Sequence, residues 1–248
     1  FSTHWNLRTA VNYRRMNSKA KFPPALFKFL GELKKHNDRE WFAEHKSEYE
    51  RVVVEPFCAF ILQIRQPLMA ISPFLVADER AHGGSLRRVY RDIRFSKNKA
   101  PFKTNAAAVF WHRTAKDRAP GIYLHLQPGE SFAAAGLWQP ERADLLMVRQ
   151  AIAAESKAWR KALAATGPAW TRGGEQLSRP PKGFLPTHPE IEELKYKNFV
   201  VSARLTDRRI CAADFADHFV ELCRDLSPML GFLNHALGIP WNKADAAK

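Results

Sequence analysis

Apolar side chains recur at helical spacing near the N-terminal end of the chain. After Pro23 this spacing continues to Leu33 and predicts a first helix. The motif that begins at Asn37 resembles a capping box, in which the Asn37 side chain caps a second helix. Pro56 is expected to interrupt that helix or to open another one. Pro67 is expected to kink or end the helix that follows Pro56.

The same helical spacing returns in the C-terminal half. It predicts a helix that Pro140 opens and that closes near Gly167. A short helix is expected after Pro189, and a long final helix is expected to include Phe215. Pro228 is expected to kink that last helix, because its ring removes a backbone donor and crowds the preceding turn.

Between these helical regions the period changes to two. Alternating apolar and polar residues predict four strands with short connections, at residues 89–95, 102–111, 121–127 and 132–138. This order predicts an antiparallel meander, and residues 198–202 predict one further strand. The expected fold class is α+β, with a mostly antiparallel central sheet flanked by helices at both ends of the chain.

Composition then indicates how the chain is divided. The 248 residues are 46% hydrophobic and 26% charged, which is typical of a globular protein. Residues 1–21 are basic and lack apolar periodicity, and the first acid in the chain is Glu32. We therefore expect a disordered basic arm at residues 1–21 and a single α+β domain at residues 22–243.

The formal net charge of +14 favours phosphate-rich partners or anionic surfaces. Cys58, Cys211 and Cys223 are few and widely spaced, which indicates a reducing compartment and gives no disulfide framework. No apolar run is long enough to span a membrane, so we expect a cytoplasmic protein with no membrane partner. The pattern leaves the oligomeric state open.

The densest charge lies at residues 87–104, where seven cations stand against a single acid, Asp92. We interpret this stretch as a basic β-hairpin that binds an anion, because Arg offers a planar fork of donors and Lys a point charge. The candidate anion-binding residues are Arg88, Arg94, Lys97, Lys99, Lys103 and Thr104. Arg91 falls on the apolar face, so we expect it to form a structural ion pair or to bind carbonyl groups from elsewhere.

A pocket beside the hairpin is expected to be lined by Tyr90, Asp92, His125 and Trp138. In an enzyme, the acid or base would be Asp92, His125 or His188, and the sequence does not separate them. Residues 129–133 partly match a nucleophile elbow, but an extended segment follows where that motif needs a helix. The chain has no P-loop, dinucleotide fingerprint or metal-ligand spacing, so no cofactor and no metal are expected.

Four sequence blocks after Phe22 follow one another in a characteristic order. The first reads Asn-Asp-Arg-Glu-Trp-Phe at residues 37–42, and the strongest reads Tyr-Arg-Asp-Ile-Arg-Phe-Ser-Lys at residues 90–97. Two more lie at residues 131–140 and 181–199. Together they resemble the domain of unknown function 2461 family of uncharacterised bacterial and fungal proteins. The resemblance implies a fold and a cellular setting, and it implies no established activity.

The chain departs from the family pattern at a few positions. Residues 133–135 are alanines where the family tends to have glycines, and Asn98 and Thr187 replace common acids. Carboxylate chemistry is therefore not expected at Asn98 or Thr187.

Two classes of function follow from these residues. The first is a binding module for an anionic ligand, either a phosphate-bearing metabolite or a nucleic acid whose bases stack on aromatic residues among the cations. The alternative is an enzyme that acts on a phosphorylated or carboxylated small molecule in the pocket beside the hairpin. Salt-dependent binding of DNA or RNA would favour the first class. A deep pocket that joins the hairpin to His125 and Trp138 would favour the second.

Overall fold

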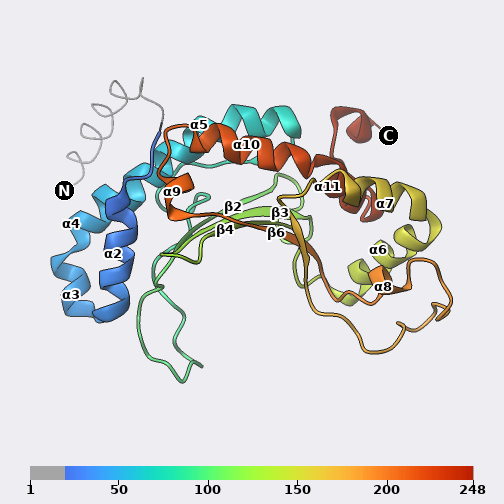
Figure 1. Ribbon diagram of the computed structural model, residues 1–248, viewed down its shortest axis with the longest axis horizontal. Coiled ribbons are helices and arrows are strands. Elements are labelled where there is room, and N and C mark those ends of the chain that lie inside the picture. Colours follow the sequence, from blue (N-terminus) through green and yellow to red (C-terminus); the bar gives the residue numbers. More distant parts are fainter. Residues whose placement is uncertain (1–19, 248) are drawn as a thin grey trace.

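The computed structural model describes residues 20–247, and its centre is a six-stranded antiparallel sheet in the order β1-β2-β3-β4-β6-β5 (Figure 1). The strands are Leu75–Val76 (β1), Ala106–His112 (β2), Gly121–Leu126 (β3), Phe132–Leu137 (β4), Thr171–Gly173 (β5) and Phe199–Arg204 (β6). The predicted α+β class is confirmed. Most of the predicted basic arm, residues 1–19, lies outside the described residues, and the single domain at residues 22–243 stays a prediction.

Alternation along the strands gives the sheet two unlike faces. In β3, Ile122, Leu124 and Leu126 are fully buried, whereas Tyr123 and His125 between them are half-buried. The buried face lies under α5 (Glu55–Ile71) and α10 (Phe215–Asp225), which cross it side by side (Figure 1). The ring of Phe110 on β2 packs 5.8 Å from that of Phe219 on α10, so this interface forms the centre of the core.

The remaining helices lie at the two ends of the sheet (Figure 1). The N-terminal group consists of α2 (Pro24–Lys35), α3 (Arg39–Glu44), α4 (Lys46–Tyr49) and a π-helical turn (Glu50–Val54) that runs into α5. The later helices are α6 (Arg142–Ala154), α7 (Ser156–Ala164), α8 (Ile191–Leu194), α9 (Asp207–Ile210), α11 (Ser227–Ala236) and a 3-10 turn (Lys243–Ala247). The second face of the sheet is only partly covered, because Tyr123, His125 and Phe132 on it are half-buried.

Proline positions explain where the prediction of helices holds and where it fails. Pro56 stands in the first turn of α5, directly after the π-helical turn Glu50–Val54, so it opens α5 as predicted while the helical stretch from Lys46 continues through it. Pro67 lies inside α5 and does not end it, which corrects one of the two predicted effects, whereas a kink at Pro67 stays a prediction. The helix continues because Ile64 and Leu68 are completely buried on either side of Pro67, and this packing offsets the lost hydrogen bond.

The C-terminal half has more breaks than the helical spacing predicted. The helix expected from Pro140 is two helices, α6 and α7, which meet at Glu155. The final helix is also divided: α10 and α11 join at Leu226, with Pro228 in the first turn of α11. Two short strands, β1 and β5, form in segments where no strand was predicted. Strands of two or three residues carry too little alternation to be recognised in a sequence.

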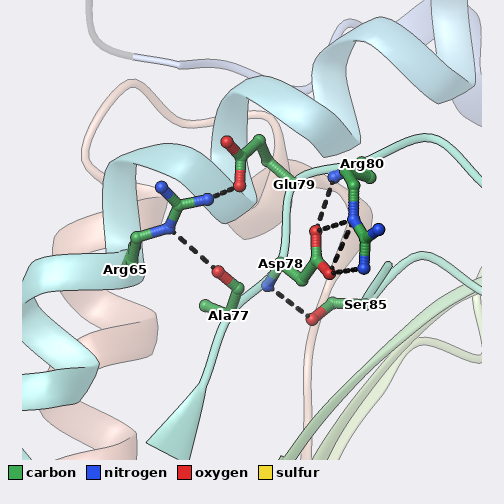
Figure 2. Close-up of polar contacts among 6 residues, drawn as sticks. All are labelled: Arg65, Ala77, Asp78, Glu79, Arg80 and Ser85. Carbon is green, nitrogen blue, oxygen red and sulfur yellow. Dashed lines mark hydrogen bonds and ion pairs between the residues drawn. The ribbon is translucent and has the colours of Figure 1, made fainter. Parts of the chain in front are cut away.

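The loop at residues 77–85 is held by internal pairing, and we call it the paired loop. The Asp78 carboxylate accepts hydrogen bonds from the Arg80 guanidinium at 2.9 and 3.0 Å, and Glu79 forms an ion pair with Arg65 of α5 (Figure 2). The Arg65 Nε atom also donates to the Ala77 carbonyl at 3.0 Å (Figure 2). The charges of Asp78, Glu79 and Arg80 are thus all matched by a partner within or beside the loop.

Residues 87–104, which we call the basic loop, follow directly and differ from the predicted hairpin. Its two arms run antiparallel, but a single bridge between Tyr90 and Phe102 stands where a strand at residues 89–95 was predicted. The Asp92 and Asn98 side chains accept bonds from nearby backbone N–H groups, of Arg94 at 3.3 Å and of Ala100 at 2.9 Å. Such local turns compete with a strand ladder and explain why none forms.

One helical stretch, Lys46–Ile71, is long and apolar enough to cross a membrane by length and composition. This corrects the prediction that no such segment exists. The indication is weak, because a core helix passes the same test, and Phe57, Phe60 and Ile61 of this stretch are buried in the core. A cytoplasmic location stays a prediction.

Candidate anion-binding surface

The basic loop is attached to the N-terminal helices at its base (Figure 1). The Asn37 side chain forms a hydrogen bond to each backbone group of Phe102, accepting from the N–H and donating to the carbonyl, both at 3.0 Å. The Phe102 ring stacks on Phe42 of α3 with centroids 4.2 Å apart. Because Asn37 is occupied in this way, Asp38 caps α3 instead, and its carboxylate accepts from the Trp41 N–H at 2.9 Å. This corrects the predicted cap.

The first hollow lies between the basic loop and the open face of the sheet. It has a volume of about 400 Å³, and Arg87, Arg91, Lys103, Asn105 and Tyr123 are among its lining residues. Asp92 is the one acid among the described residues that lines it. Three cations and one acid therefore face a space large enough for a small ligand or for one unit of a polymer.

Two further hollows of about 420 and 410 Å³ adjoin the first, and all three share Arg91. The second hollow also has Lys34 of α2, Lys103 and Thr104 in its wall. Within residues 20–247, no acid lines the second or the third hollow. We call the cations of the three hollows the basic track, which comprises Lys46, Arg39, Lys34, Arg91, Lys103 and Arg87.

Arg91 is held at the junction by neutral acceptors. Its Nη1 donates to the Ala100 carbonyl at 3.0 Å, and its Nη2 lies 3.4 Å from the Ser96 hydroxyl. The predicted ion pair is thus replaced, in the part of the chain that the structure describes, by the alternative of a carbonyl partner. Because these partners carry no charge, the positive charge of Arg91 remains available to an anion in any of the three hollows.

Lys103 lies among like charges. Its ammonium group donates to the Arg88 carbonyl at 2.9 Å. Partial burial lowers the pKa of Lys103, and the charges of Arg87 and Arg88 lower that pKa further. Crowded cations without a matching carboxylate repel one another, so binding an anion among them would stabilise all three.

Asp92 does not neutralise this cluster, because Arg94 binds it. The Arg94 guanidinium donates to both carboxylate oxygens, at 3.0 and 2.7 Å. These hydrogen bonds lower the pKa of Asp92, so the carboxylate stays ionised. Arg94, predicted as an anion-binding residue, is therefore already engaged by the protein's own carboxylate.

The other predicted anion-binding residues are placed unequally. Lys103 lines two hollows and Thr104 lines one. Arg88 and Lys97 are exposed, and the Lys99 ammonium donates to the Ile93 carbonyl at 3.1 Å. The structure therefore brings together part of the predicted set, because Arg88, Lys97 and Lys99 are not among the residues that line the three hollows.

The four predicted pocket residues do not share one pocket. Tyr90 lines the third hollow and Asp92 the first. His125 pairs with Phe132 at the start of β4, whereas Trp138 lies just past the end of that strand and is 65% exposed. Six strand residues separate these two ends, a span of about 20 Å. The prediction of a deep pocket that joins the basic loop to both His125 and Trp138 is therefore wrong.

His125 is held in a network on the open face of the sheet. Its Nδ1 accepts from the Tyr123 hydroxyl at 3.1 Å and from the Asn105 amide at 3.3 Å, which leaves Nε2 to donate to Gln127 Oε1 at 3.3 Å. Burial lowers the pKa of His125. At neutral pH the ring is uncharged and fully hydrogen-bonded, which suits a positioning role for Tyr123 and Asn105.

The family model described as "Conserved hypothetical protein (DUF2461)" matches residues 25–232. The chain belongs to the DUF2461 family. The matched region includes every cation of the basic track and the paired loop. No curated protein and no solved structure matches this DUF2461 chain.

Several residues of the DUF2461 surface were missed from the sequence. Lys34, Arg39 and Lys46 come from the N-terminal helices, and their convergence on the basic loop depends on the contact between Asn37 and Phe102. A local sequence pattern does not predict such a contact between distant segments. Arg87 belongs to the basic stretch that was recognised in the sequence. Because the strand prediction was wrong, it was not predicted that Arg87 lines the first hollow together with Tyr123.

Metal chemistry has no support in the described part of this DUF2461 chain. Within residues 20–247, no group of three or more His, Cys, Asp or Glu side chains is arranged to hold a metal ion. The His112 Nε2 atom donates a hydrogen bond to the Pro240 carbonyl, 2.7 Å away, and the ring stacks on Phe74 with centroids 5.1 Å apart. Its position is that of a buried structural histidine.

Proposed function

We propose that this protein binds an anionic, phosphate-bearing ligand in the hollows around Arg91. One observation carries the proposal. Arg87, Arg91 and Lys103 line the first hollow, and the single acid in its wall, Asp92, is occupied by Arg94, which lies outside the hollow. An arrangement that leaves three cations unneutralised in one concave place favours a ligand that brings the missing negative charge.

The chemistry of these side chains suits phosphate. Arg87 and Arg91 each present a planar fork that matches two phosphate oxygens, and Lys103 adds a compact point charge. Asn105 lines the same hollow and, with one amide hydrogen donated to His125, has a second one to donate to a ligand, whereas the Tyr123 hydroxyl already donates its only hydrogen to His125. A carboxylate ligand fits the same donors, and it offers fewer acceptor oxygens than a phosphate.

Catalysis has less support than binding. Asp92 is ionised and engaged by Arg94, so it is a poor proton donor. His125 is engaged on both ring nitrogens and does not line any of the three hollows. An enzyme acting on a phosphorylated or carboxylated small molecule therefore remains the weaker alternative.

A melting-temperature screen tests the proposal, because a ligand that binds only the folded state raises the midpoint. Inorganic phosphate, tripolyphosphate, sugar phosphates, nucleotides and citrate are compared at one ionic strength. We expect at least one phosphate-bearing compound to raise the midpoint, with citrate weaker. The proposal fails if none of these anions shifts the midpoint of the unaltered protein.

The site is then located with variants that are expected to weaken tripolyphosphate binding and one that is expected to tighten it. Arg87→Ala and Lys103→Ala are expected to weaken tripolyphosphate binding by roughly tenfold each. Asp92→Asn removes the acid of the first hollow and is expected to tighten binding. Lys157→Ala is the matched control, because Lys157 is an exposed cation on α7, at the other end of the sheet (Figure 1). Equal weakening in the control would place the binding elsewhere.

A further inference from the structure

We infer that the ligand of the basic track is a single strand of nucleic acid, an inference that rests on the proposed function and names its ligand class. The first reason is the layout of the hollows. Lys103 and Asn105 line both the first and the second hollow, and Phe102 lines both the second and the third. The hollows are therefore contiguous, and we call the succession of their cations, from Arg87 in the first hollow to Lys46 in the third, a row.

The row is longer than a single phosphate group requires. Lys46 and Arg39 stand in the third hollow, Lys34 in the second and Arg87 in the first, with Arg91 common to all three. Small-molecule sites bury most of their ligand in one enclosed pocket, and these three hollows are open to solvent. A chain of successive phosphates matches successive cations in open hollows better than a compact metabolite does.

Aromatic rings stand at both ends of the row. Tyr90 lines the third hollow and is 53% exposed, and its ring is fixed from behind by Phe102, 5.3 Å away, and by Phe42, 6.3 Å away. Tyr123 lines the first hollow and lies 5.9 Å from the Phe132 ring. An exposed ring that packing already holds in place offers a base a stacking surface at little cost in side-chain entropy.

The shape of the surface also separates a nucleic acid strand from a membrane. The tip of the basic loop carries Phe95, which is 94% exposed beside Arg94, and such a tip alone would suit an anionic bilayer. However, Arg87, Arg91 and Lys103 lie in hollows, which a nearly flat bilayer does not enter. A flexible single strand follows a concave row of cations, so it reaches charges that the membrane would leave unused.

Fluorescence anisotropy with labelled oligonucleotides of about 12 nucleotides tests the inference. This length is chosen because the binding sites of single-strand-binding folds cover about 4–16 nucleotides. The probes are oligo-dT, oligo-U and a duplex of the same length, with unlabelled tripolyphosphate and phosphatidylserine vesicles as competitors. We expect a single strand to bind more tightly than the duplex and to resist competition by vesicles. Duplex binding of equal strength, or displacement by vesicles alone, would overturn the inference.

Stacking is tested at Tyr90. Tyr90→Ala is expected to weaken oligonucleotide binding roughly tenfold and to leave tripolyphosphate binding unchanged, because only a base stacks on the ring. Tyr90→Phe keeps the ring and is expected to retain full oligonucleotide affinity. If Tyr90→Ala unfolds part of the loop, both ligands lose affinity together. In that case Tyr90→Phe is compared with the unaltered protein for binding to purine and to pyrimidine strands. Equal affinity of Tyr90→Ala and Tyr90→Phe for oligonucleotides would overturn the stacking argument.

The length of the row is tested at Lys46, which is exposed and lines the third hollow, whereas Arg87 lines the first. Lys46→Ala is expected to reduce the salt dependence of oligonucleotide binding by about 0.7 in the log–log slope. The same change is expected to leave tripolyphosphate binding at Arg87 and Lys103 unaffected. An unchanged slope would mean that the ligand does not extend along the row.

The two proposals fail in different ways. If tripolyphosphate binds and is weakened by Arg87→Ala, while oligonucleotides bind no more tightly than tripolyphosphate does, the anion site stands and the nucleic acid inference is wrong. If neither tripolyphosphate nor any oligonucleotide binds, both proposals are wrong.

Discussion

The paired loop and the basic loop are neighbours in the chain, and they treat charge in opposite ways. In the paired loop, Asp78 and Glu79 each meet an arginine (Figure 2). The backbone of this loop closes on itself where the Ser85 N–H donates to the Asp78 carbonyl at 2.8 Å. In the basic loop, Arg87, Arg91 and Lys103 face open hollows, with one acid that is already bound. The first arrangement holds the fold together, and the second costs stability unless an anion is present.

This contrast teaches how a structural charge is distinguished from a charge available for binding. Composition already gives the paired loop one arginine against two acids and the basic loop seven cations against one acid. Composition does not show which of these charges has a partner of opposite sign, because that depends on the fold. Arg65 reaches Glu79 from α5, whereas Lys34 and Arg39 bring further positive charge to the basic loop from α2 and α3.

The largest loss of stability is expected where the paired loop closes on its own backbone. A Cβ atom at Gly84 would lie 2.3 Å from the Arg80 carbonyl oxygen and 2.6 Å from that of Asp78. Gly84→Ala is therefore expected to lower the free energy of unfolding by about 1–3 kcal/mol, as overpacking does elsewhere. Urea denaturation monitored by circular dichroism measures this change.

Gly83 provides the matched control for that variant. Its φ of 75° disfavours a side chain, but nothing lies within 4 Å of a Cβ atom there. Gly83→Ala is expected to cost about 1 kcal/mol from the backbone conformation alone. If the two alanine variants lose equal stability, the close approach at Gly84 does not determine how the loop closes.

The next largest effect is expected at the ion pair between Arg65 and Glu79, whose side chains are 32% and 24% exposed. Arg65→Met leaves a carboxylate without its partner, and we expect a loss of about 1–2 kcal/mol in the free energy of unfolding. Glu79→Gln in the same chain is expected to recover part of that loss, because the unpaired charge is gone. A double-mutant cycle by urea denaturation checks the coupling, and a coupling energy of zero would contradict it.

A smaller effect is expected at Arg91, where the two roles meet. Arg91→Ala removes the hydrogen bond to the Ala100 carbonyl, and we expect it to cost about 1 kcal/mol and also to weaken anion binding. Arg94→Ala is the comparison within the same loop. Its ion pair with Asp92 is exposed, so we expect little change in stability. Thermal melts of both variants measure this, and equal losses would reject the division of roles between Arg91 and Arg94.

The sequence predicted the sheet better than it predicted the surface. Strands β3 and β4 have regular alternation and short connections, and they form where residues 121–127 and 132–138 were predicted. The basic stretch was recognised as a place for an anion, but its strand was wrong. Alternation at Val89 and Ile93 resembles a strand, whereas the Asp92 and Asn98 side chains favour turns, and the turns prevail.

The rest of the surface was not predictable from local pattern. The basic track depends on Asn37, which was predicted to cap a helix and which binds Phe102 instead. Two roles competed for one side chain, and the neighbouring Asp38 was able to take the cap. Only the three-dimensional arrangement decides such a competition, because both alternatives satisfy the local backbone equally well.

The smallest change in stability is expected at Arg87, and its sign makes it the sharpest test of the contrast. Burial lowers the pKa of Lys103, and Arg87 lowers it further, so Arg87→Ala is expected to raise that pKa. A lysine whose pKa is depressed by folding makes the protein less stable at pH values where it is charged, and stability recovers as the pH rises through the folded-state pKa. Removing Arg87 relieves part of that cost.

Arg87→Ala is therefore expected to leave stability unchanged or slightly higher at neutral pH, while anion binding falls. An NMR titration of the Lys103 ammonium, combined with a urea midpoint, measures both quantities, and Lys157→Ala serves as the control for loss of one exposed cation. A residue that supports the fold loses stability when it is removed, as at Arg65. If Arg87→Ala destabilises the protein as much as Arg65→Met does, then Arg87 has a structural partner after all, and the contrast between the two loops disappears.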